Sequence, residues 1–361
     1  MFKIIGRVLL IFLLVTVAMG AKAKSDFSVL FVNPSVSGEP FWQKVQTITE
    51  QTASQLNIKI DTIYGEGNRH IQLAELKKYL SYRATPDYVI LMNYPGGAEA
   101  TLDLLNKYGI NFITLEQTIT GPERSSIGMP KGRYKTWLGE VYHDNYDAGW
   151  RLAEALVNDT GLAKGDIAAL IINGHYGSES DVRSQGANDF FAKQKITVHQ
   201  QVHASWSKEQ AYDKTKKLLS RYPNTNLIWT ASDLMAMGAL TGVKASKLDH
   251  SVAIGGFDWL GDAIDLVDNG GMSATIGGHF MMGGWALVTL SDHFHKHPFW
   301  LENSSLTFKL GVISQQNLDD YRWIVYSPDW SLIDYKAMSL IGTDKVDYGF
   351  NLSQLQRSAE K

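Results

Sequence analysis

The sequence predicts an α/β protein built from two doubly wound, Rossmann-like lobes with a ligand cleft between them. Three observations favour this fold class. Short apolar runs rich in β-branched residues alternate with helical patterns along most of the chain, as expected for βαβ units. A less regular stretch from Glu116 to Gly139 divides these units into two series. The length of 361 residues also suits about two domains.

The expected strands are almost continuously apolar in several places, which is typical of strands buried on both faces of a parallel sheet. They cover residues 28–32, 58–63, 88–92, 111–115, 167–172, 196–202, 227–229, 252–255 and 274–276. Between them, apolar side chains recur at helical spacing. The clearest sets are Val45, Ile48, Thr52 and Leu56; Leu73, Leu76 and Leu80; Ala148, Leu152 and Ala155; and Ala211, Thr215, Leu218 and Leu219.

The stretch between the two series is predicted to be a long loop, because it contains Gly121-Pro122 and Met129-Pro130. The second series begins near Tyr142. Ligands of open α/β sheets bind beyond the carboxyl ends of the strands. Two facing lobes would therefore place both sets of strand ends around one cleft.

Composition excludes several functional classes. The chain has 34 Lys and Arg against 37 Asp and Glu, and this slightly acidic balance disfavours nucleic acid as a partner. It contains no cysteine, which excludes a disulfide scaffold, a cysteine-based zinc site and a thiol nucleophile.

Residues 1–23 are predicted to be a cleavable signal peptide. Lys3 and Arg7 precede a short apolar run, and Ala21-Lys22-Ala23 fits a cleavage site. The alternative is a retained membrane anchor, but the apolar run is short for a bilayer. Export without cysteine favours a bacterial periplasm.

Aromatic and charged side chains follow the ends of the first series of strands. Phe41 and Trp42 come after the first strand, and aromatic faces suit the C–H faces of a sugar ring. These two residues could equally staple the start of a helix to the core. Glu116 ends the fourth strand. Its carboxylate could accept hydrogen bonds from a ligand, or it could be a solvated charge in a loop.

The second series carries a similar set. Arg183 precedes a helix, and its guanidinium could hold hydroxyls or a carboxylate with two parallel bonds. It could also form a surface ion pair with Asp181 or Asp189. Trp206 lies in a polar loop. Its ring could be a platform for a ligand, or it could anchor the loop. Two further strand ends carry Ser232 with Asp233, and Phe257 with Asp258.

No sequence motif predicts an enzyme. The chain lacks a Gly-x-Ser-x-Gly elbow, a Walker loop and a Gly-x-Gly-x-x-Gly turn after a strand. The alternate spacing of His293, His295 and His297 would spread them around a helix instead of gathering them as metal ligands. Asp233 and Asp258 have no obvious nucleophile beside them. We therefore expect no catalysis, no cofactor and no metal.

Five motifs in this order resemble those of the type 1 periplasmic solute-binding proteins, the family of ribose- and galactose-binding proteins. The resemblance extends from about Phe27 to about Gln316. The motifs are Pro40-Phe41-Trp42, Thr114-Leu115-Glu116, Arg183 ahead of a helix, Ser232-Asp233 before a small-residue helix, and Gly256-Phe257-Asp258.

Within that family, the segment from Gly177 to Arg183 and the segment Leu138-Gly139-Glu140 look most like autoinducer-2-binding proteins, which pass their signal to a membrane sensor kinase. The sequence departs from that group at Gly278, where those proteins end the third crossover strand with a ligand-gripping arginine.

The resemblance implies where the lobes and the site lie. One lobe would comprise residues 24–139 and 279–305, the other residues 140–278 and 306–326, with a multi-strand hinge between them and a tail over residues 327–361. The aromatic residues would sandwich a ring, and the acids and the arginine would bond its edge. The implied ligand-binding residues are Glu39, Phe41, Trp42, Glu116, Arg183, Trp206, Ser232, Phe257 and Asp258, with Asp233 and His279 as second-tier candidates.

The resemblance also implies a function. A monomeric periplasmic protein would close on a small sugar-like ligand and present it to a membrane partner, in the first place the permease of a sugar ABC transporter. The alternative partner is a sensor kinase. A third possibility is an amine-bearing ligand, because several carboxylates would offset its charge. A repressor of the same fold is disfavoured, since a signal peptide stands where a helix-turn-helix would lie.

Overall fold

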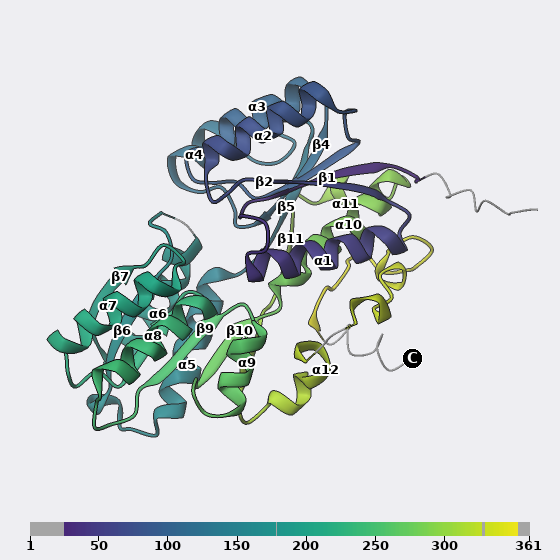
Figure 1. The fold of residues 1–361 in the computed structure, drawn as a ribbon. Coiled ribbons are helices and arrows are strands. Elements are labelled where there is room, and N and C mark those ends of the chain that lie inside the picture. The colour runs from purple at the N-terminus through teal and green to yellow at the C-terminus, as the bar shows by residue number, and fades with distance from the viewer. Residues whose placement is uncertain (1–24, 178, 327–328, 353–361) are drawn as a thin grey trace, which may run out of the picture.

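A computed structural model describes residues 25–177, 179–326 and 329–352. The expected signal peptide, residues 1–23, lies outside the described residues. Figure 1 shows two lobes, each with helices packed on a central sheet. Within the described ranges, no helix combines the length and the apolar character that crossing a bilayer needs.

The sheet of the first lobe has six strands in the order β11-β5-β4-β3-β1-β2, and every neighbouring pair is parallel. Its strands are β1 (Ser28–Asn33), β2 (Lys59–Tyr64), β3 (Tyr88–Leu91), β4 (Asn111–Glu116), β5 (Trp137–His143) and β11 (Ser305–Phe308). The helices of this lobe are α1 (Pro40–Gln55), α2 (Arg69–Tyr82), α3 (Ala98–Lys107), α4 (Gly121–Ile127), α10 (Met282–Phe294) and α11 (Phe299–Glu302).

The second sheet repeats this order as β12-β10-β9-β8-β6-β7, with only the edge strand β12 antiparallel. Its strands are β6 (Ala168–Asn173), β7 (Thr197–His203), β8 (Leu227–Thr230), β9 (Ala253–Phe257), β10 (Ala274–Gly277) and β12 (Gly311–Ser314). The helices are α5 (Asn145–Thr160), α6 (Glu179–Gln194), α7 (Lys208–Arg221), α8 (Asp233–Ser246), α9 (Gly261–Asp268) and α12 (Arg322–Val325). The predicted class, two parallel-sheet α/β lobes, is therefore confirmed.

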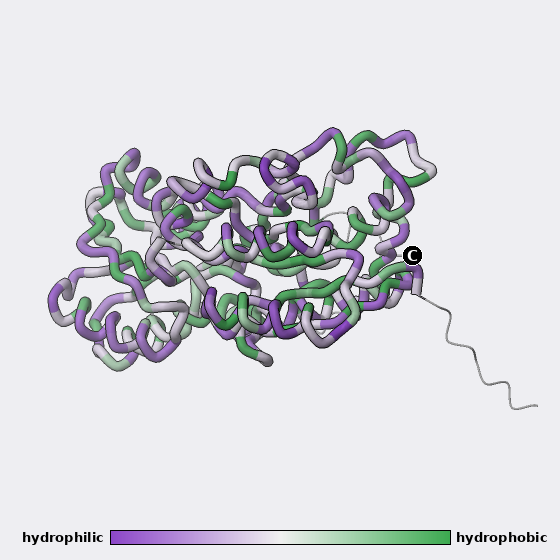
Figure 2. The backbone as a smooth tube through the Cα atoms, turned by 90° about the horizontal axis from the view of Figure 1, so that it is seen from above, coloured by the Kyte–Doolittle hydropathy of each residue, from purple (hydrophilic) through white to green (hydrophobic). Residues whose placement is uncertain are grey.

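The apolar runs form the strands because both faces of each sheet are covered. Every residue of β3, β6, β8 and β9 is buried, as continuous apolar strands require. Figure 2 shows hydrophobic stretches through the interior of the molecule and mixed, more polar segments at its outside.

The irregular stretch from Glu116 to Gly139 is not one long loop, as expected, but contains α4 and the start of β5. Pro122 occupies the first turn of α4, where a missing N–H costs nothing. Trp137 is fully buried and adds a strand to the sheet. Sequence analysis also missed β11 and β12, which are only four residues each.

The chain passes between the lobes after β5, after β10 and between β11 and β12. The expected boundaries at 139/140 and 305/306 fall inside β5 and β11, because both strands pair along their whole length within the first sheet. The crossover segments meet at the side of the cleft, where Figure 1 shows the narrow connection between the lobes.

The described part of the C-terminal segment packs on the first lobe. The Gln55 amide donates to the backbone oxygen of Ile333 at 2.7 Å, and the ring of Phe350 stacks on Trp285 with centroids 5.1 Å apart. The buried carboxylate of Asp292 accepts bonds from Ser339 Oγ, Leu340 N and Tyr348 Oη.

We predict that Asp292→Ala destabilises the protein by about 3 kcal/mol, because three donors lose a charged acceptor in a buried place. The free energy of unfolding from urea denaturation measures this loss. Asp344→Ala, at an exposed position of the same segment, should change it by less than about 0.5 kcal/mol. Equal effects of the two variants would show that the C-terminal segment is not anchored through Asp292.

Candidate functional site

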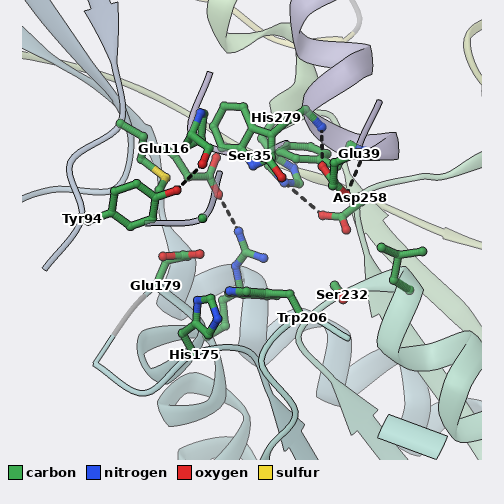
Figure 3. A pocket seen from close by; sticks show the side chains of 17 residues that line it. Ser35, Glu39, Tyr94, Glu116, His175, Glu179, Trp206, Ser232, Asp258 and His279 are labelled. Atoms are coloured by element: carbon green, nitrogen blue, oxygen red, sulfur yellow. Dashed lines mark hydrogen bonds and ion pairs between the residues drawn. The ribbon is translucent and has the colours of Figure 1, made fainter. Parts of the chain in front are cut away.

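The carboxyl ends of the strands in both lobes surround a cavity of about 150 Å³. One water molecule needs about 10–15 Å³ of such a cavity. The cavity is roughly ten times larger than that, so it has room for one small ring. Figure 3 shows its side chains converging from the two lobes. The lining residues are Pro34, Ser35, Glu39, Phe41, Trp42, Gly67, Met92, Tyr94, Glu116, His175, Glu179, Arg183, Trp206, Ser232, Leu234, Asp258 and His279.

A buried ion pair between Arg183 and Glu116 joins the lobes across this cavity. Arg183 Nη2 lies 2.7 Å from Glu116 Oε1, and both side chains are almost fully buried. The guanidinium also donates from Nε to Asn145 Oδ1 at 2.7 Å and from Nη1 to the backbone oxygen of Ala231 at 3.1 Å. Its face lies 4.5 Å from the ring centre of Phe257. Arg183 is thus fixed on every side.

The backbone of Arg183 is positioned by close packing of α5 and α6. A Cβ atom at Gly149 would lie 1.7 Å from the Arg183 carbonyl oxygen, and one at Gly186 would lie 2.0 Å from that of Tyr146. Only glycine permits this approach. The two helices can therefore pack closely enough to bring Arg183 to the cavity.

A second polar group at the other side of the cavity pairs Asp258 with His279. Asp258 Oδ1 lies 3.3 Å from His279 Nε2. Asp258 has a φ of 112°, a strained value that non-glycine residues seldom adopt. The next residue, Trp259, is tied to the first lobe, because Lys44 Nζ donates to its backbone oxygen at 2.7 Å.

Glu39 caps the first helix beside this pair. Its carboxylate accepts bonds from the backbone N–H groups of Phe41 at 3.3 Å and Trp42 at 2.8 Å. A carboxylate at this position is stabilised by the free N–H groups and the positive end of the helix dipole. The cap orients Phe41 and Trp42, so the local sequence Glu39–Trp42 builds one wall of the cavity.

Aromatic side chains form the walls on both sides of the cavity. Phe41, Trp42 and Tyr94 come from the first lobe, and Trp206 comes from the second. The Trp206 ring covers Gly174 so closely that a Cβ atom there would lie 2.2 Å from the ring. Trp206 is therefore both anchored in its loop and exposed to the cavity, which combines the two interpretations of this residue.

The structure brings nine of the eleven expected site residues to the cavity lining: Glu39, Phe41, Trp42, Glu116, Arg183, Trp206, Ser232, Asp258 and His279. Asp233 and Phe257 are fully buried and do not line it. Asp233 instead accepts bonds from Leu260 N at 2.9 Å and Thr275 Oγ1 at 2.7 Å. Phe257 supports the guanidinium of Arg183 from behind. Both residues therefore hold neighbouring groups in place and do not themselves face the cavity.

Sequence analysis missed Met92, Tyr94, His175 and Glu179 among the lining residues. Met92 and Tyr94 follow β3, so the rule that ligands bind beyond strand ends could have found them. His175 and Glu179 lie in the loop after β6 and at the start of α6. The same rule applies to them, because both follow the end of β6.

Burial dominates the electrostatics of this site. It raises the pKa of Glu116 to about 8, although the adjacent Arg183 acts in the opposite direction. It raises the pKa of Asp258 to about 7 against the pull of Arg183 and Lys44. Burial also lowers the pKa of His143 and His279 well below the usual range, so both imidazoles favour the neutral form. Removal from water disfavours each charged form.

We predict that Asp258→Asn gains stability relative to the unmodified protein as pH rises from 5 to 7. The folded protein keeps the Asp258 proton up to a pKa of about 7, whereas the unfolded chain releases it near 3.8. The acid therefore contributes stability at low pH that is lost as pH rises. Urea unfolding at several pH values should show a relative change of about 2 kcal/mol over this window.

The control for this measurement is Asp262→Asn, which changes an exposed carboxylate on α9. Its stability relative to the unmodified protein should not vary over the same pH window. The same comparison cancels the contribution of His143, because it is present in all the proteins and Asp258 is not among the groups that shift its pKa. A pH-independent difference for Asp258→Asn would refute the raised pKa.

Comparison with known proteins agrees with this geometry. A family model described as "Periplasmic binding protein domain" matches residues 29–294. The D-allose-binding periplasmic protein of Escherichia coli is 28% identical over 269 residues, which are 71% of this chain and 80% of that protein. The ribose import binding protein of Haemophilus influenzae is 26% identical over 247 residues, 67% of this chain and 77% of that protein.

A solved structure shows the same fold over nearly the whole chain. The periplasmic sugar-binding protein from Pseudomonas fluorescens superimposes with a TM-score of 0.80 at 26% identity, covering 92% of this chain and all of that one. The particular likeness to autoinducer-2 receptors stays a prediction, since these relatives are sugar-binding proteins. The matched family model, the relatives and the cleft between two parallel-sheet lobes agree, and the chain belongs to the type 1 solute-binding proteins of the periplasmic binding protein family.

Proposed function

We propose that this protein binds a small sugar-like ligand between its lobes in the periplasm and presents it to the permease of an ABC transporter. The observation that carries this proposal is the cavity itself. Aromatic rings line it from both lobes, and charged groups meet at its edges. Such walls suit the C–H faces of a sugar ring, and the polar edge suits its hydroxyls.

The contacts across the cavity support binding coupled to closure. Arg183 and Glu116 come from different lobes, and so do Asp258 and Glu39. A ligand that bonds to residues of both lobes stabilises the closed arrangement over an open one. The closed outer surface would then be the form that the membrane partner recognises.

The relatives support an importer as the partner. The names of two of them refer to D-allose binding and to ribose import. A sensor kinase remains the alternative partner, but no observation on the site favours it. The polar groups do not form a catalytic arrangement either: the Ser232 hydroxyl accepts from Met235 N at 3.3 Å as a helix cap. We therefore propose a binding role without catalysis.

We predict that Trp206→Ala weakens sugar binding by about 1–3 kcal/mol, because the ligand loses an aromatic wall. Isothermal titration calorimetry measures the affinity after a thermal-shift screen of D-allose, D-ribose, other pentoses, hexoses and inositols has found a ligand. A ligand at 100 times its dissociation constant should add about 2.7 kcal/mol of stability.

Tyr82→Ala is the matched control, because Tyr82 is an exposed aromatic residue of α2 away from the cavity. It should bind the ligand as the unmodified protein does. Unchanged affinity in Trp206→Ala, together with lowered stability, would show that Trp206 is only a loop anchor. The absence of any hit in this screen and among the corresponding amino sugars would refute the sugar-like ligand.

A further inference from the structure

The cavity carries a surplus of negative charge. Four carboxylates line it: Glu39 and Glu116 from the first lobe, and Glu179 and Asp258 from the second. Among the described lining residues, Arg183 is the only one with a fixed positive charge. The nearby Lys44 does not line the cavity, and its ammonium group is bound to the backbone oxygen of Trp259.

This surplus acts across the cleft, so it bears directly on closure. The charge of Asp258 disfavours ionisation of Glu39 in the opposite lobe. The charge of Glu179 likewise disfavours ionisation of Glu116. Like charges on facing surfaces oppose their approach. Arg183 compensates Glu116 directly at 2.7 Å. It also acts on Glu179 and Asp258, but burial outweighs its effect on their pKa values, so one lining cation serves several carboxylates.

Two buried side chains on the cavity have unused polar atoms. Glu116 is 3% exposed, and its Oε2 has no hydrogen-bond partner. His279 is 1% exposed, and its Nδ1 has no hydrogen-bond partner, whereas its Nε2 lies 3.3 Å from Asp258 Oδ1. Buried polar atoms of native proteins are rarely left unpaired. Both residues line the cavity (Figure 3), so a ligand group bound there lies close to these atoms.

We propose that the ligand carries a protonated amino group on a hydroxylated ring, that is, an amino sugar or an aminated cyclic polyol. This inference rests on the proposed function and narrows its ligand class. An ammonium group has three donors and no acceptor, and carboxylates only accept, so the two are complementary. Its charge cancels part of the surplus when the lobes close, whereas a neutral sugar leaves that surplus in place.

The aromatic walls are compatible with this ligand. Phe41, Trp42 and Trp206 can contact the C–H faces of the ring, and their faces also attract a nearby cation. Burial raises the pKa of Glu39 and Glu179 as it does for Asp258. An ammonium ligand supplies a counter-charge that stabilises the ionised form of these acids.

The test is calorimetric titration of the full mature chain with D-glucose, D-galactose and D-mannose, each beside its 2-amino and its N-acetylamino counterpart. The panel of neutral sugars described above is titrated in the same buffer. We expect at least one 2-amino sugar to bind about tenfold or more tightly than its neutral parent, because a charge-assisted bond replaces a neutral one. The N-acetyl counterpart, which has lost the charge, should bind no better than the parent.

Two variants test which groups are responsible. Glu39→Gln and Glu179→Gln each remove one cavity charge while keeping an oxygen acceptor, and each should reduce the preference for the amino sugar by about tenfold. Glu209→Gln, at an exposed position of α7, should leave the preference unchanged.

The outcomes separate this inference from the proposed function. Tight binding of a neutral sugar without preference for its amino counterpart would overturn the inference and leave the proposed function intact. Failure of every sugar, neutral and aminated, would overturn both. An amino preference that survives in Glu39→Gln and in Glu179→Gln would overturn the assignment of the cavity carboxylates.

Discussion

The buried ion pair between Arg183 and Glu116 is the interaction on which the arrangement of the site depends. Two charges removed from water are tolerated only when further bonds compensate them. Arg183 meets this condition through Asn145, the Ala231 carbonyl and the ring of Phe257. Glu116 belongs to the first lobe and Arg183 to the second. The bond between them therefore holds the two lobes in this relative position.

The rest of the fold supplies rigid bodies on either side of this contact. The parallel sheets are covered by helices, and the close glycine contacts between α5 and α6 help to set the position of Arg183. The C-terminal segment adds to the rigidity of the first lobe through Asp292. It also reaches the hinge, where the Leu352 side chain would lie 2.9 Å from a Cβ atom at Gly278. The absence of a side chain at Gly278 thus gives Leu352 its place beside the crossover.

The cavity combines aromatic walls with several carboxylates. The aromatic walls fit any ring with C–H faces, and they do not select among sugars by charge. In the proposal made above, the carboxylates select by charge, because they are largely buried and Coulomb interactions are stronger there than in water. Specificity in such a site comes from leaving the wrong ligand with uncompensated groups. Glu39, Glu179 and Asp258 are placed for that role.

The sequence by itself determined the class of fold, most strands and the strand-end residues that face the cavity. Continuous apolar runs identify buried parallel strands such as β6, and the strand-end rule leads to Glu116 and Asp258. The tertiary structure alone decided which of these residues meet. Neighbouring residues such as Ser232 and Asp233 separate into a lining side chain and a buried one, because the turn into α8 points them in different directions. The periodicity of apolar residues within one segment does not show which residues of the other lobe will face it. The pairing of Glu116 with Arg183 depends on how the two separate sheets come together, so the sequence could not predict it.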